Sequence, residues 1–198
     1  MLKILTFTTL FPNAIQPVHG IFVENRLRHL VNSGNVNATV VAPVPWFPSR
    51  NERFKPYSDY APVPMTENRH GLNIYHPRNP VIPKIVTNLA PLLMYLFVKP
   101  FIGNLSRQGF EFDLIDAHYF YPDGVAAAML GRRFDKPVTV AARGTDINLL
   151  PQYALPRAQI KWAANNVQGM ITVCQALKDE LTALDVDPEK IRVLRNGV

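Results

Sequence analysis

Residues that could bind or activate a ligand gather at three points of this 198-residue sequence. The first is the pair His19 and Gly20, which stands where a helical pattern begins. Backbone N–H groups at the start of a helix suit a phosphate, and glycine removes a side chain that would block its approach. The same glycine could instead serve only a tight turn. The pair therefore predicts either a phosphate-binding turn or a structural one.

The second point follows the strand expected at residues 112–117 and contains His118 and Tyr119. A histidine at the carboxyl end of a strand can hydrogen-bond a ligand hydroxyl or act as an acid or base near neutral pH. It can equally be a histidine whose ring is satisfied by a nearby carbonyl. Both alternatives remain open on the residues alone.

The third point places a fixed cation, Arg143, three residues before a carboxylate, Asp146, around Gly144. These two side chains could pair with each other across a turn. Alternatively, Asp146 would bind sugar hydroxyls while Arg143 meets an anion. A further cation, Arg78, stands between two prolines and either faces the same cleft or is solvated.

The elements that must position these residues are short apolar runs alternating with amphipathic helical patterns. Strands are expected at residues 3–7, 38–42, 72–76, 112–117, 138–142, 169–173 and 191–194. Helices are expected at residues 21–34, 123–134, 155–166 and 175–184. This alternation predicts a doubly wound α/β fold, a mainly parallel Rossmann-like sheet with helices on both faces. Ligands bind beyond the carboxyl ends of the strands in such sheets, where the three points lie.

Two stretches depart from this alternation. Residues 43–64 contain six prolines and several aromatic residues, so we expect a long loop with no regular element there. Residues 85–108 predict one or two helices, broken near Pro100. Within that segment the window 85–98 is too short for a comfortable membrane span.

Within this window, residues 88–98 carry apolar residues on every helical face. Its ordinary interpretation is a helix buried between the sheet and its neighbours. Because Lys84 and Lys99 flank it, the alternative is a helix that dips into an anionic membrane surface.

Composition and charge narrow the class of protein. An apolar fraction of 47% excludes a disordered chain, and one cysteine, Cys174, excludes an internal disulfide and fits a reducing, cytoplasmic compartment. The net charge of +6 lies in residues 1–112, which carry 11 Lys/Arg against 5 Asp/Glu, whereas residues 113–198 carry 10 of each. No run of cations resembles a nucleic-acid site. The charge points to an anionic small molecule or membrane surface.

The sequence lacks the motifs that are typical of several enzyme classes. The five histidines have no cysteine partner at ligand spacing, so no metal site is expected. The sequence also lacks G-x-G-x-x-G, G-x-S-x-G and P-loop patterns, which argues against dinucleotide oxidoreductases, hydrolases and NTPases.

Four ordered motifs carry a resemblance to a known family. They are FDLIDAH at 112–118, TVAARGTD at 139–146, ANNVQGMITVCQALKDEL at 164–181 and KIRVLRNGV at 190–198. These are similar to the motifs P-D-V-V-H-A-H, T-x-H-G-x-D, A-D-x-V-I-x-V-S-x-x-L-K and K-I-x-V-I-x-N-G-V-D. The sequence resembles the N-terminal half of a retaining glycosyltransferase of family 4 (group 1), with the two-domain GT-B fold.

The resemblance implies transfer of a sugar, of the hexosyltransferase type, from a nucleotide-diphosphate donor to a hydroxyl of a glycan or lipid-linked acceptor. No cofactor is implied beyond the nucleotide-sugar co-substrate. The implied roles are catalytic for His118; acceptor or sugar binding for Arg143, Asp146, Arg78 and Tyr119; donor-phosphate binding for His19 and Gly20; and the interdomain cleft for Asn196 and Gly197. Residues 1–198 would form one acceptor-side domain. The donor-binding domain would be absent from this chain, which alone would be inactive.

This sequence departs from the family pattern at several positions. Asp116 stands where the first family histidine would be, and Arg143 replaces the usual histidine. Cys174 stands where serine is typical, and His19-Gly20 replaces a double glycine.

Two other classes of function stay open: a non-catalytic glycan- or membrane-binding module, and another Rossmann-type enzyme. The expected partners of the transferase are the nucleotide sugar, the acceptor and an anionic membrane surface, with no nucleic acid. The expected localisation is cytoplasmic, with a peripheral contact to the inner face of the plasma membrane as one option.

Overall fold

A single large sheet runs through the protein in the computed structural model, which describes residues 1–46, 51–55, 57–80 and 87–195. Seven of its eight strands are parallel, and β4 at one edge is antiparallel. In spatial order the strands are β10 (Ile191–Val193), β9 (Gly169–Thr172), β8 (Val138–Ala142), β7 (Leu114–His118), β1 (Leu2–Phe7), β2 (Val36–Val41), β5 (Leu72–Tyr75) and β4 (Thr66–Arg69).

The chain begins in the middle of this sheet and winds outward in both directions. From β1 it proceeds through β2 to β5, and it then returns to the other side of β1 as β7, β8, β9 and β10. Phe7 at the end of β1 pairs with Val41 on one side and with Ala117 on the other. The winding reverses between β1 and β7, and this reversal point is where a doubly wound sheet binds its ligands. The predicted fold class is confirmed.

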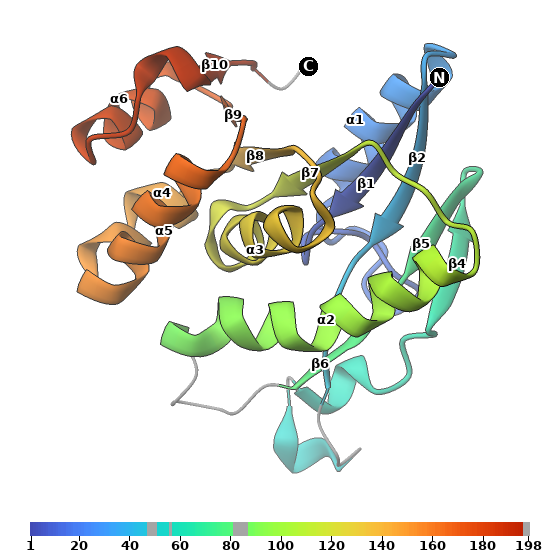
Figure 1. The fold of residues 1–198 in the computed structure, drawn as a ribbon. Helices are drawn as coiled ribbons and strands as arrows, with labels where there is room; N and C mark the ends of the chain where they lie inside the picture. The colour runs from blue at the N-terminus through green and yellow to red at the C-terminus, as the bar shows by residue number, and fades with distance from the viewer. Residues whose placement is uncertain (47–50, 56, 81–86, 196–198) are drawn as a thin grey trace.

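Helices cover both faces of the sheet (Figure 1). One face packs against α1 (Ile21–Asn32), and the other against α2 (Ala90–Arg107), α3 (Val125–Phe134) and α5 (Ala154–Asn166). Ile4 of β1 joins the cluster of α1, whereas Leu5 and Phe7 join the larger cluster on the opposite face. Successive side chains of a strand point to opposite faces, so an apolar run such as residues 3–7 supplies both cores.

Shorter elements complete the chain. They are α4 (Thr145–Asn148), α6 (Gln175–Ala183), the 3₁₀ turns η1 (Glu52–Phe54), η2 (Tyr57–Tyr60), η3 (Thr87–Leu89), η5 (Leu150–Gln152) and η6 (Pro188–Lys190), and the irregular helical turn η4 (Phe120–Gly124). Every strand and helix predicted outside the two unusual stretches is present, with bounds shifted by about two residues.

The predicted break near Pro100 is wrong, and the helix expected to be buried in this segment is buried on one side only. The helix α2 continues through Pro100, which is exposed, so the carbonyl that loses its N–H partner can be hydrated. One side of α2 buries Met94, Val98 and Ile102. The opposite side leaves Leu92, Leu96 and Phe97 41%, 45% and 46% exposed. No helix among the described residues is long and apolar enough to cross a bilayer, and the membrane contact of this segment stays a prediction.

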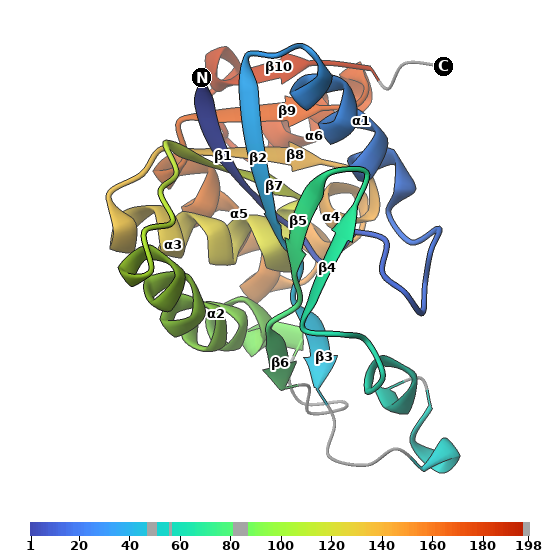
Figure 2. The same ribbon diagram turned by 90° about the vertical axis from the view of Figure 1, so that its right-hand side faces the viewer.

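The proline-rich segment 43–64 is also more regular than expected. Its first residues form β3 (Val44–Trp46), which pairs in parallel with β6 (Arg78–Pro80) as a separate two-stranded sheet (Figure 2). Each strand of a two-stranded sheet is an edge, and an edge strand tolerates proline because the missing N–H faces away from the partner. Neither β6 nor the edge strand β4 was expected. Residues 47–50 and 56 of the predicted loop lie outside the described part of the chain.

Candidate functional site

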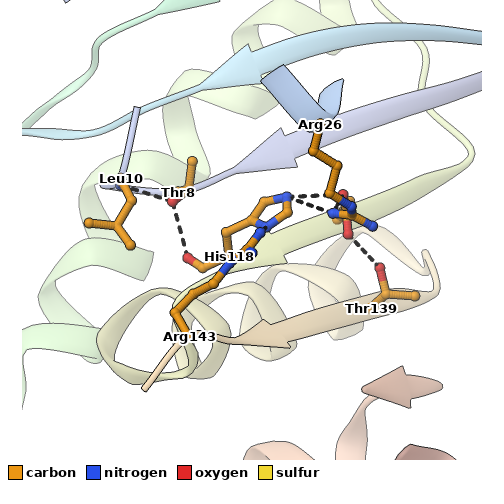
Figure 3. Close-up of polar contacts among 7 residues, drawn as sticks. Thr8, Leu10, Arg26, His118, Thr139 and Arg143 are labelled. Atoms are coloured by element: carbon orange, nitrogen blue, oxygen red, sulfur yellow. Dashed lines mark hydrogen bonds and ion pairs between the residues drawn. The ribbon is translucent and has the colours of Figure 1, made fainter. Parts of the chain in front are cut away.

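The reversal point between β1 and β7 holds a buried group of polar side chains. Asp116 and His118 are two residues apart in β7, so they point to the same face of the sheet, the face covered by α1. Their side chains are buried, with residue exposures of 4% and 1%. Arg26 reaches them from α1 and Arg143 from the end of β8 (Figure 3).

The hydrogen bonds of His118 fix which ring nitrogen carries the proton. Arg143 Nη2 lies 2.5 Å from His118 Nδ1, and a guanidinium can only donate, so Nδ1 is the acceptor. A neutral imidazole carries one hydrogen, so this hydrogen is on Nε2, which lies 3.1 Å from both Asp116 Oδ2 and Arg26 Nη1 and donates to the carboxylate. The imidazole is held as one neutral tautomer.

Two further groups complete the surroundings of Asp116. Arg26 Nη1 lies 3.1 Å from Asp116 Oδ2, and the Thr139 hydroxyl donates to Oδ1 at 2.9 Å. Burial lowers the pKa of His118. Asp116 opposes this shift, but the charges of Arg143 and Arg26 act with burial, so the pKa is below its ordinary value and the ring is neutral near pH 7. Burial acts to raise the pKa of Asp116, but the hydrogen bonds and charges of its partners outweigh it and hold that pKa well below its usual range. Asp116 is therefore ionised.

Asp116 and Arg143, the two departures from the family histidines, contact opposite nitrogens of the same imidazole. The His118 ring is buried, and both of its nitrogens have protein partners. Its predicted contact with substrate stays a prediction. Arg26 was not among the predicted site residues. The signal that could have found it is the alternation of Asp116 and His118 in a buried strand, since a buried carboxylate needs a cation.

Asp146 is held by backbone groups of the protein, and its predicted binding of sugar hydroxyls stays a prediction. It is 0% exposed, and its carboxylate accepts the backbone N–H groups of Phe120 at 2.6 Å, Gly144 at 2.7 Å and Arg143 at 3.0 Å. Pairing with the Arg143 side chain across the turn was the other alternative, but the hydrogen bond comes from the Arg143 backbone. Asp146 therefore shapes the turn that aims the guanidinium at His118.

The remaining predicted acceptor residues lie in two different places. The Tyr119 hydroxyl is 2.8 Å from Thr145 Oγ1, next to the Asp146 turn. Arg78 lies in β6, where its Nη2 donates to the carbonyl of Val63, and the structure does not bring it to the His118 group. Acceptor binding by Tyr119 and by Arg78 stays a prediction. The predicted cleft residues Asn196 and Gly197 lie outside the described residues.

The loop between β1 and α1 explains why residue 20 is glycine. Gly20 has φ +67°, and a Cβ at this position would lie 2.3 Å from the carbonyl carbon and oxygen of Leu10. The ring Nε2 of His19 is 3.2 Å from the carbonyl oxygen of Thr9, to which it donates. Close packing of the loop therefore accounts for the glycine by itself, and phosphate binding by His19 and Gly20 stays a prediction.

A second buried carboxylate, Asp123, was not predicted from the sequence. It is 0% exposed and accepts the Thr9 N–H at 2.5 Å and the Thr9 hydroxyl at 2.9 Å, so it ties the β1–α1 loop to the start of α3. The Thr8 hydroxyl adds a parallel link, donating to the His118 carbonyl at 3.1 Å and accepting from Leu10 N–H at 2.9 Å (Figure 3). Burial raises the pKa of Asp123 to about 7, although the bonds from Thr9 oppose it.

This pKa predicts a pH dependence of stability that Asp123→Asn abolishes. The pKa of Asp123 in the folded state, about 7, is above its ordinary value of 3.8. The folded protein therefore binds this proton more tightly, and the stabilisation is complete below about pH 4 and lost as the pH rises through about 7. Between about pH 5 and pH 8 the wild type should lose about 3 kcal/mol from this group. Urea unfolding of both proteins across that range measures the difference; parallel profiles would contradict it.

Two hollows adjoin these residues. A groove of about 710 Å³ runs between α1 and the ends of β8 to β10, and Arg26, Arg143 and Arg195 line it. A cavity of about 310 Å³ lies beyond β1, β2 and β5, and its lining residues include Gln16, His19, Tyr60, His76 and Asn79. Arg143, rather than His118, faces the open groove.

Comparison with known proteins identifies the family of this chain. The model of the family described as Glycosyltransferase Family 4 matches residues 20–198. TuaC of Bacillus subtilis (strain 168), named for a glycosyltransferase role in teichuronic acid biosynthesis, is 27% identical over 186 residues. The match covers 92% of this chain and 47% of TuaC, so the chain spans about half the length of this relative.

Solved structures share the fold at low sequence identity. Alr3699/HepE from Anabaena in complex with UDP has a TM-score of 0.59 at 15% identity, covering 100% of this chain and 44% of HepE. UDP-N-acetylglucosamine 2-epimerase from Rickettsia bellii has a TM-score of 0.58 at 12% identity, covering 99% of this chain and 45% of the epimerase. These likenesses show that the chain has the architecture of one half of a GT-B protein.

Proposed function

Because this chain belongs to glycosyltransferase family 4, we propose that it is the acceptor-side domain of an enzyme that transfers a sugar from a nucleotide-diphosphate donor to a hydroxyl of a glycan or glycolipid, with retention of configuration. TuaC is a named glycosyltransferase, and HepE was solved with UDP. The chain spans about half of each of these proteins, so we assign donor binding chiefly to a second domain outside it.

The observation that carries the acceptor role is the cavity beyond β1, β2 and β5. Its described lining residues include no lysine, arginine or acidic residue. Three of the side chains that border it keep a buried polar atom with no hydrogen-bond partner among the described residues: Gln16 Oε1, His76 Nε2 and Asn79 Oδ1. Buried polar atoms are nearly always satisfied, so atoms left this way suit a ligand that brings hydroxyl groups. Met94 and Pro122 add apolar surface for a sugar ring.

The ring of His76 offers a hydrogen-bond acceptor to a ligand hydroxyl. Its Nδ1–H donates to the Ala42 carbonyl at 2.9 Å, and burial lowers the pKa of the ring, so Nε2 is an acceptor. Glu67 Oε1, a second acceptor, lies 3.4 Å from Nε2. Two acceptors that face each other are stabilised when a donor comes between them, and a ligand hydroxyl is such a donor.

In this proposal the domain acts by positioning. Holding the acceptor hydroxyl beside the donor sugar removes much of the entropic barrier, and fixed cations stabilise the departing diphosphate. We propose no metal and no cofactor other than the nucleotide sugar. His118 donates its Nε2 hydrogen to Asp116, so in this arrangement we assign it the positioning of Arg143 rather than proton transfer.

The test is transfer of a labelled sugar by the full-length protein, with nucleotide sugars screened against glycan and glycolipid acceptors. We expect a product whose anomeric configuration by NMR equals that of the donor, and Asn79→Ala should raise the acceptor KM by about tenfold. The exposed Asn68→Ala is the matched control and should change nothing. An inverted product would overturn retention. Glycan binding without transfer from any donor would favour the non-catalytic module.

A further inference from the structure

The groove along α1 concentrates positive charge next to apolar walls. One face of the helix contributes Phe22, Arg26 and His29, and the strand side contributes Arg143, Ile171 and Arg195. The described residues that line the groove include three arginines and no Asp or Glu. The volume of about 710 Å³ is the size of sites that take a single small molecule.

Two of these arginines are held in fixed positions around one neutral ring. Arg26 Nη1 donates to Asp116 Oδ2, the carboxylate beside the ring, at 3.1 Å, and Arg143 Nη2 donates to His118 Nδ1 at 2.5 Å. The Arg143 guanidinium also stacks over the Phe22 ring, 5.0 Å from its centroid. Fixed guanidinium groups lose little conformational entropy when they bind, which favours recognition of an oxyanion.

The charges at this point do not cancel. One positive charge is left when the charges of Arg26, Arg143 and Asp116 are added, because His118 is neutral. The Asp146 carboxylate accepts hydrogen bonds from three backbone N–H groups. Burial lowers the pKa of Arg143 to about 10, and the charge of Arg26 acts in the same direction. Asp116 offsets one of the two guanidinium charges, and an anion in the groove would offset the other.

We propose that this groove binds the oxyanion of a small molecule, a phosphate or carboxylate, through Arg143 and Arg26, with an apolar or ring-shaped part of the same molecule against Phe22 and Ile171. The inference deepens the proposed function and rests on it only for the source of the anion. That source is either the diphosphate of the donor or the carboxylate of an acidic sugar. The neutral cavity beyond β1, β2 and β5 is a separate site for uncharged hydroxyls.

Calorimetric titration of the full-length protein with pyrophosphate, and separately with glucuronate against glucose, tests the proposal. At least one anion should bind, and glucose should not bind in this groove. Arg143→Gln and Arg26→Gln should each weaken the anion by about tenfold or more, since each removes a charged hydrogen-bond partner. Arg28→Gln removes the same charge from α1 outside the groove and should change the affinity less than twofold. Arg143→Lys, which keeps the charge, should lose less than Arg143→Gln and guards against a folding artefact.

The two anions and the variants distinguish the possible ligands of the groove. Binding of pyrophosphate alone assigns the groove to the donor diphosphate, and binding of glucuronate alone assigns it to an acidic sugar. The proposal is wrong if neither anion binds, or if Arg28→Gln weakens binding as much as Arg143→Gln. Anion binding without any sugar transfer would overturn the proposed function and leave this inference standing. If neither anion bound and Arg143→Gln transferred sugar as fast as wild type, this inference would be wrong and the proposed function would stand.

Discussion

Replacing Asp146 by alanine should lower the free energy of unfolding by about 4 kcal/mol, because one buried and two partly buried backbone N–H groups lose their acceptor at about 1–3 kcal/mol each. Those groups belong to Phe120, Arg143 and Gly144, and they hold the turns after β7 and β8 against each other. Burial raises the pKa of Asp146, so the carboxylate itself is costly to bury and the loss is smaller than the three bonds would sum to. The damage should extend to Arg143, whose position depends on this turn.

Urea unfolding monitored by circular dichroism measures the loss, and Asp187→Ala is its matched control. Asp187 accepts one backbone N–H, from Glu189 at 2.9 Å, at the start of the exposed turn η6. Its loss should amount to about 1 kcal/mol or less. If both variants were destabilised equally, the central role of Asp146 in the turn would be wrong.

Gly20→Ala should have the second largest effect, destabilising the protein by about 3 kcal/mol or more from left-handed strain and steric overlap together. The added Cβ would lie 2.3 Å from backbone atoms of Leu10 and 2.8 Å from the backbone nitrogen of Phe11, and backbone cannot rotate out of the way. The chain must therefore shift the whole β1–α1 loop, which Thr9 and Asp123 hold from the other side.

Gly34→Ala separates the two causes of that loss. Gly34 also has a positive φ, +76°, but a Cβ there would meet no atom within 4 Å. Only the backbone strain remains, which amounts to about 1 kcal/mol. Thermal and urea unfolding of both variants should show the larger loss for Gly20→Ala. Equal losses would mean that the close approach of Leu10 does not constrain residue 20.

The fold was predictable because each buried strand is a short apolar run between polar turns. The parallel strand β8 is of this kind, and burial on both faces selects β-branched and small apolar residues. The edge strand β4 has the sequence TENR and buries no residue fully, so it carries no hydrophobic signal. Similarly, the apolar content of α2 could not distinguish a buried helix from one that exposes Leu92, Leu96 and Phe97.

The site was predictable in position but not in contacts. Reading the residues after each strand located His118, Arg143 and Asp146, because parallel strands bring their carboxyl ends to one edge. Spacing could not show that Asp146 would take backbone N–H groups, or that Arg26, 90 residues before Asp116, would pair with it. Such pairings depend on how α1 packs across the sheet.

The distribution of charge along the sequence did not predict where the basic side chains gather in the structure. The excess of cations in residues 1–112 predicted an anionic acceptor or membrane surface. Among the residues that the structure describes, the cavity assigned to the acceptor is lined without charged Lys, Arg, Asp or Glu. The groove combines Arg26 with Arg143 and Arg195, which come from the part of the sequence that is neutral overall. Net charge over a segment therefore did not locate the basic site.

The most direct test of this account is the rate of sugar transfer by the full-length protein carrying Arg143→Gln, compared with wild type and with the exposed Arg133→Gln. The account predicts transfer from a nucleotide-diphosphate sugar by wild type and by Arg133→Gln at equal rates. It predicts a loss of about 100-fold in kcat/KM for Arg143→Gln, the scale of removing one fixed donor from a site of developing negative charge. Transfer by Arg143→Gln at the wild-type rate, or no transfer by wild type from any nucleotide sugar, would contradict it.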